Sequence, residues 1–84
     1  MDLDITLGEL IVYPNPTATG MFTVSYEGQI NAIELFDMIG RIVQVPTDLS
    51  TGHVNGSELA NGKYMVRVTT DSGIITKEII VLNK

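Results

Sequence analysis

The side chains of this 84-residue chain that could do acid–base or metal chemistry are one histidine and ten carboxylates. His53 lies between Gly52 and Val54, where a loop or an edge strand is expected. A zinc site or a nucleophile–base pair needs a histidine to converge with other ligands or with a hydroxyl, and the chain has no cysteine to add. We therefore interpret His53 as an exposed residue without a chemical role.

The carboxylates are spread along the chain. A calcium loop places oxygen ligands at alternate positions, and only Asp2 and Asp4 approach that spacing. No spacing indicates the acid–base pair of a glycoside hydrolase. The eight glycines occur singly, so none forms a phosphate-binding loop that opens a helix. The sequence predicts no catalytic residue, no metal ligand and no cofactor-binding residue, and hence a protein that is not an enzyme.

The charge of the chain excludes two classes of partner. Its net charge is −5, and its five basic residues are scattered. Binding to nucleic acid needs a basic patch that releases counterions, and attachment to an anionic membrane surface needs a polybasic cluster. The apolar runs are also far shorter than the ~20 residues of a transmembrane helix. We expect neither nucleic-acid binding nor direct membrane insertion.

Alternation of apolar and polar residues, broken by regular turn signals, predicts an all-β fold. Residues 46–50 are expected to be a polar connection, and no stretch shows a convincing helical period. Seven short antiparallel strands predict a small immunoglobulin-like β-sandwich. The expected strands cover residues 10–13, 21–26, 30–36, 41–45, 52–55, 63–70 and 74–82.

Two local patterns predict how strands are joined. Residues 37–40 fit a four-residue hairpin loop in which Asp37 accepts backbone hydrogen bonds and Gly40 takes a positive φ. Gly62, two residues before Tyr64 at the start of a strong strand, is typical of a tyrosine corner, in which the hydroxyl bonds to upstream backbone.

The segment Tyr13-Pro14-Asn15-Pro16 is the most specific local signal. Proline fixes φ and has no N–H, and it pushes the preceding residue to extended conformations. We expect a stiff extended segment that leaves a strand edge and then turns at residues 17–20.

The last strand loses its alternation, because residues 79–82 read Ile-Ile-Val-Leu. Such a run indicates either a strand covered on both faces or an exposed, adhesive terminus. The sequence leaves both interpretations open.

Four segments, in this order and spacing, resemble the type A C-terminal sorting domain of the type IX secretion system of Bacteroidota. The segments are residues 11–16 with Gly20 and Phe22, residues 33–43, residues 57–68 and residues 76–84. The resemblance covers residues 10–84 and leaves residues 1–9 as a linker or remnant of an upstream region.

The resemblance implies a non-catalytic signal domain that directs a cargo protein through the type IX translocon across the outer membrane. It implies a periplasmic stage on the way to the cell surface or the extracellular space. A sortase-like peptidase would then cut upstream of the domain, and no cofactor would be needed.

The resemblance also implies which residues matter. The residues implied for sorting are Lys77, Ile79, Ile80, Val81, Leu82 and Lys84. The residues implied for shaping the fold are Tyr13, Pro14, Asn15, Pro16, Gly20, Asp37, Gly40, Leu59, Gly62 and Tyr64. An apolar C-terminal strand can pair with an acceptor sheet edge, and such pairing would account for the lost alternation.

The alternative is an immunoglobulin- or fibronectin-like accessory module that binds carbohydrate or acts as a spacer in an extracellular enzyme or adhesin. Carbohydrate platforms use exposed aromatic rings, and tryptophan is absent. We expect Phe36 to point outward, whereas Tyr13, Phe22, Tyr26 and Tyr64 should mostly point inward. Free strand edges would also allow two copies of the domain to associate.

Overall fold

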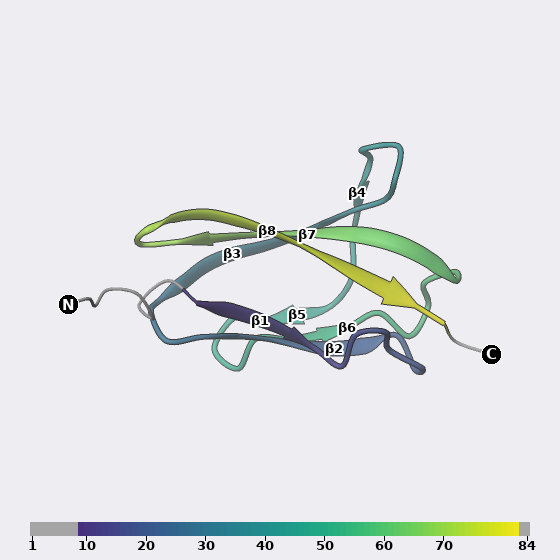
Figure 1. Ribbon diagram of the computed structural model, residues 1–84, viewed down its shortest axis with the longest axis horizontal. Coiled ribbons are helices and arrows are strands. Elements are labelled where there is room, and N and C mark those ends of the chain that lie inside the picture. The colour runs from purple at the N-terminus through teal and green to yellow at the C-terminus, as the bar shows by residue number, and fades with distance from the viewer. Residues whose placement is uncertain (1–8, 83–84) are drawn as a thin grey trace.

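The computed structural model describes residues 9–82 of the chain (Figure 1). The expected linker over residues 1–9, except Glu9, and the implied sorting residue Lys84 lie outside the described residues. The described residues form an all-β sandwich whose two layers are seen edge-on in Figure 1.

The strands follow the predicted alternation closely. Residues 9–82 contain eight strands: β1 (Leu10–Tyr13), β2 (Met21–Tyr26), β3 (Ile30–Phe36), β4 (Ile42–Val43), β5 (Thr47–Asp48), β6 (His53–Asn55), β7 (Gly62–Thr70) and β8 (Gly73–Val81).

Two short strands differ from the prediction. The fourth strand is only two residues long instead of spanning residues 41–45, and β5 lies inside the stretch that was expected to be a polar connection. Both residues of β5 are exposed, so their side chains leave no alternation to detect. Their pairing with Val54 and His53 of β6 is set by backbone hydrogen bonds instead.

The strand order is that of an immunoglobulin-like sandwich. One antiparallel sheet has the order β1-β2-β6-β5, and the other has the order β4-β3-β7-β8. In immunoglobulin nomenclature the first order is A-B-E-D, and β3-β7-β8 corresponds to C-F-G. The predicted fold class is therefore confirmed, with β4 as an additional strand beside β3.

The core lies between the two sheets. Val66 and Val68 of β7 and Ile79 and Val81 of β8 are each 0% exposed, and Phe22 of β2 faces them from the other sheet at 1% exposure. The inward-facing positions of β7 are those that alternation predicts, since β-strand side chains point to opposite faces in turn.

The two isoleucines of β8 allow a matched test of this core. Replacing fully buried Ile79 with alanine should lower the free energy of unfolding by about 2–5 kcal/mol, because a cavity remains in the packed interior. The same replacement at Ile74, which is 64% exposed, should cost about 1 kcal/mol or less. Urea unfolding of both variants measures the difference, and equal losses would contradict this assignment of the core.

Candidate functional site

The C-terminal strand β8 holds most of the residues implied for sorting, and its backbone has two different edges. It pairs with β7 in one continuous antiparallel register from Gly73 opposite Thr70 to Val81 opposite Gly62. In such a ladder, alternate residues turn their N–H and C=O groups toward the partner strand and away from it. The groups of Glu78, Ile80 and Leu82 turn away from β7.

Four of those outward groups are bound by a segment that follows β1. The side-chain amide of Asn15 donates to the carbonyl oxygen of Glu78 (2.8 Å) and accepts from the amide of Ile80 (3.0 Å). The backbone of Thr17 donates to the carbonyl of Ile80 (2.8 Å) and accepts from the amide of Leu82 (2.9 Å). Thr17 thereby forms a parallel bridge with Val81.

We call Asn15–Thr17 the bridging segment. Only a carboxamide side chain offers a donor and an acceptor arranged like those of a peptide group, so Asn15 acts as one more peptide unit along the β8 edge. The segment follows β1, which belongs to the opposite sheet, so these hydrogen bonds tie the two sheets together beside the C-terminus. In Figure 1 the end of β8 descends toward this part of the other layer.

Thr17 is a buried polar residue whose hydrogen bonds are satisfied. It is 0% exposed, and its hydroxyl donates to the carbonyl of Met21 (2.8 Å) and accepts from the amide of Gly20 (3.1 Å). Gly20 has a φ of +87°, and a Cβ there would collide with the carbonyl oxygen of Gly56. This is the turn predicted at residues 17–20, but no local pattern predicts that Thr17 reaches β8.

The residues implied for sorting fall into two environments. Ile79 and Val81 are fully buried, so they cannot touch a partner while the domain is folded. Lys77 is exposed, Ile80 is half-buried and Leu82 is 52% exposed. Neither interpretation of the apolar run therefore holds throughout, because one face of the strand is covered and the other is partly open.

The tyrosine corner at the start of β7 supports β8 from the other side. The hydroxyl of Tyr64 donates to the carbonyl oxygen of Ala60 at 2.7 Å, and Gly62 has a φ of +148°. Leu59 packs against the core from the same turn. Lys63, which follows Gly62, forms an ion pair with Glu78 of β8 at 3.3 Å.

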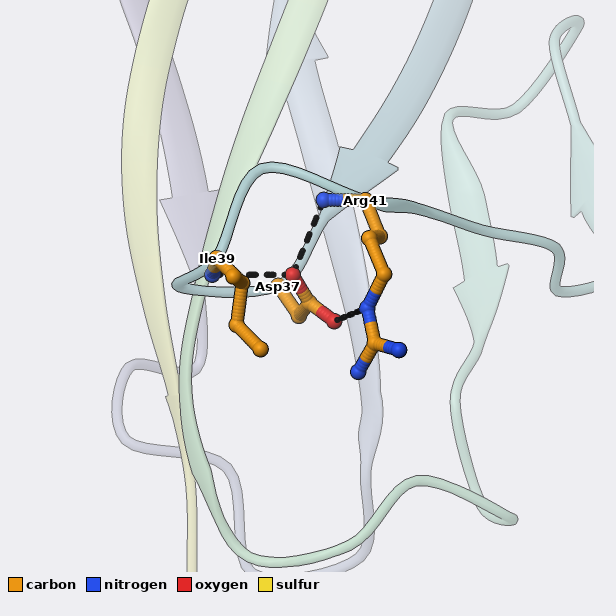
Figure 2. A network of polar contacts seen from close by, with 3 residues as sticks. All are labelled: Asp37, Ile39 and Arg41. Atoms are coloured by element: carbon orange, nitrogen blue, oxygen red, sulfur yellow. Dashed lines mark hydrogen bonds and ion pairs between the residues drawn. The ribbon is translucent and has the colours of Figure 1, made fainter.

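Asp37 organises the loop between β3 and β4, which rises above the sandwich in Figure 1. Its Oδ1 accepts from the backbone amides of Ile39 and Arg41, each at 2.9 Å, and its Oδ2 lies 3.1 Å from the Arg41 Nε (Figure 2). These interactions, chiefly the backbone bond from Arg41, hold the pKa of Asp37 below its ordinary value. With Gly40 at a φ of +92°, this is the predicted hairpin loop.

Tyr13 differs from its predicted orientation. It is 50% exposed, because Leu10 and Val12 take the inward positions of β1 and Tyr13 falls on the other face. Its ring borders a surface hollow of about 670 Å³. The side chains around the hollow are uncharged, and Thr23, Ser25 and other hydroxyl and amide residues contribute to it.

His53 is exposed in β6, as the sequence predicts. Among residues 9–82, no group of histidine, aspartate and glutamate side chains is arranged to hold a metal ion. The same residues contain no helix of the length and apolarity needed to cross a membrane.

Comparison with known proteins gives one family. A family model described as "Secretion system C-terminal sorting domain" matches residues 11–82. A search of curated proteins found no match. The matched range begins in β1 and ends directly after β8, so it includes both the bridging segment and the strand to which that segment binds.

Asn15 provides a test of the bridging segment. Asn15→Ala removes both side-chain hydrogen bonds to β8 and should lower the free energy of unfolding by about 1–3 kcal/mol. Hydrogen exchange should accelerate more at the Ile80 amide, which Asn15 binds, than at the Ile79 amide, which faces β7. Asn31→Ala, at an exposed position, is the control. Equal acceleration at both amides would contradict a local role for Asn15.

Asp37 should leave a signature in the pH dependence of stability. A lowered pKa means that folding weakens proton binding, so the stability from Asp37 is complete above the unfolded pKa, near 3.8, and is lost as the pH falls through the folded pKa. Asp37→Asn keeps an oxygen that can accept from the two amides but removes the charge. Its melting temperature should lie below that of the wild type at pH 7, and the two should converge at strongly acid pH. Thermal unfolding at a series of pH values measures both melting temperatures. A difference between them that stays the same at every pH would contradict this role of Asp37.

Proposed function

The chain belongs to the family of secretion system C-terminal sorting domains, and from this premise we propose that it directs an attached cargo protein through the type IX translocon. The family supports a role as a secretion signal, and such domains are generally non-catalytic. The role implies transit to the cell surface or the extracellular space. We propose that the cargo crosses the periplasm first and that the outer-membrane translocon recognises the folded domain.

The observation that best supports recognition of a folded domain is the fixation of β8. Its inner face is buried through Ile79 and Val81, one edge pairs with β7, and the end of its other edge is bound by Asn15 and Thr17. A strand held on three sides presents the same surface in every copy, and a preformed surface avoids the cost of ordering it on binding.

We propose that the residues implied for sorting act in two ways. Ile79 and Val81 position the strand from within the core, and Ile80 and Leu82 contact the translocon from the opposite face. Lys77 lies on the same face as Ile79 but is exposed, and it contacts the translocon from there. For Lys84 we propose a role in sorting from the family pattern alone. Because the bridging segment already occupies the outer edge of residues 78–82, an acceptor strand could pair there only by displacing that segment.

The proposed cleavage fits the position of β1. Glu9 is exposed and directly precedes β1, whose first residue, Leu10, is buried at 3% exposure. A sortase-like peptidase that cuts within residues 1–9 would separate the cargo without removing a core residue from the described sandwich. The cargo would then be released or attached at the cell surface.

A second candidate function is carbohydrate binding by an accessory module, and the exposure of Tyr13 favours it. Its ring lies beside an uncharged hollow rich in hydroxyl and amide groups, which is the chemistry that neutral sugars require. A robust hit in a glycan-array screen would support this candidate. The family match gives the sorting function priority.

Export of a reporter tests the proposed function. A periplasmic reporter joined in front of residues 1–84 should reach the medium or the cell surface in a host with a type IX system. It should stay in the periplasm when the domain is absent or when the host lacks the translocon. Retention of the fusion in the competent host, or export of the reporter alone, would contradict the proposal.

The contribution of the C-terminal end needs two variants. Removal of residues 80–84 should retain the reporter in the periplasm, but it also removes buried Val81. Leu82→Asp changes an exposed side chain and leaves the backbone bond to Thr17 possible, so its folding can be checked by circular dichroism. If Leu82 contacts the translocon as an interface anchor, export should fall about tenfold, equivalent to about 1.4 kcal/mol.

A further inference from the structure

The sandwich has four edge strands, and they differ in how far they could accept another strand. The sheet orders place β1 and β5 at the edges of one sheet and β4 and β8 at the edges of the other. Both β4 and β5 are two residues long, and β1 has four residues and ends before Pro14. Short strands and prolines are the usual protection against edge pairing. Among the described residues, β8, with nine residues, is the longest of these four edge strands.

The bridging segment covers only one half of that edge. Its hydrogen bonds begin at the carbonyl of Glu78 and continue to the amide of Leu82. By the same alternation, the N–H and C=O groups of Ile74 and Thr76 and the N–H of Glu78 also turn away from β7. No strand or loop within residues 9–82 pairs with these five groups.

The side chains of the uncovered half suit strand pairing. Ile74 is 64% exposed and Thr76 is exposed, and both residue types have high β propensity. Lys77 is exposed, and no residue of the described range forms an ion pair with it, whereas Lys63 and Glu78 pair with each other. The uncovered edge thus combines unpaired backbone groups, an apolar side chain and a positive charge.

We propose that residues 74–78 of β8 are the docking edge for a β-strand of the receiving outer-membrane machinery, an inference that rests on the proposed sorting function. The occupant is a short extended strand with an apolar residue beside Ile74 and an acidic residue beside Lys77. Backbone hydrogen bonds supply general affinity in this mode of recognition, and alternate side chains supply selectivity. The bridging segment limits the length of the added strand, since Asn15 occupies the next position along the edge.

The variant Thr76→Pro tests this edge directly. Proline is tolerated in an edge strand where the N–H faces solvent, so Thr76→Pro should remove an outward donor without breaking the ladder to β7. Thr76→Val retains the donor and is the matched control. Circular dichroism and melting temperature of both purified variants establish that they fold. Ile74→Pro, nearer the turn, is the second variant if Thr76→Pro does not fold.

Hydrogen exchange of the wild-type chain measures the edge without a host. The amides of Ile80 and Leu82 should be protected by the bridging segment, and those of Ile74 and Thr76 should exchange at least tenfold faster. Protection of Ile74 and Thr76 equal to that of Ile80 would overturn the proposal.

Export then tests recognition. With the wild-type fusion exported, Thr76→Val should be exported at the wild-type level, and folded Thr76→Pro should be exported at least tenfold less. Normal export of the folded proline variants would overturn the docking edge and leave the sorting function intact. Retention of the wild-type fusion would overturn the sorting function, and this inference with it. A wild-type dimer in sedimentation that Thr76→Pro dissociates would assign the edge to a second copy instead and overturn the proposal.

Discussion

The hydrogen bonds between the bridging segment and the end of β8 hold the two sheets of this sandwich together beside the C-terminus. Without Asn15 and Thr17, the last residues of β8 would be paired on one edge only and would be free to fray. With them, a segment that follows the first strand of one sheet fixes the last strand of the other. A domain of this size has a small core, so such a connection between its layers matters more than in a larger protein.

Much of the fold can be read from the sequence because the relevant interactions are local or periodic. Alternation locates β2 and β7, since burial of every second side chain is what stabilises those strands. Asp37 and Tyr64 bind backbone groups four residues away, so their spacing alone indicates the loop and the corner. The two residues of β5 are exposed and short, and no such regularity marks them.

The site itself could be predicted only in part, because its central contacts join distant residues. The sequence predicts that Asn15 stiffens an extended segment. In the structure its side-chain amide binds Ile80, which lies 65 residues further along the chain. No local pattern reports such a contact, and Thr17 gave no signal at all beyond its place in a turn. The apolar run at residues 79–82 was ambiguous for the same reason, since its environment is decided by a segment from the other end of the chain.

The structure also changes what an apolar C-terminal motif can mean. If the translocon bound residues 79–82 as a linear peptide, Ile79 and Val81 would have to leave the core, where both are fully buried. The burial of these two side chains stabilises the folded domain. Removing either from the interior would remove packing that holds the two sheets together. Recognition that leaves the core intact must use the parts of β8 that already face solvent. Loss of export on truncation of this motif would therefore not distinguish direct contact from unfolding, whereas substitutions on the exposed face and edge of the folded strand do.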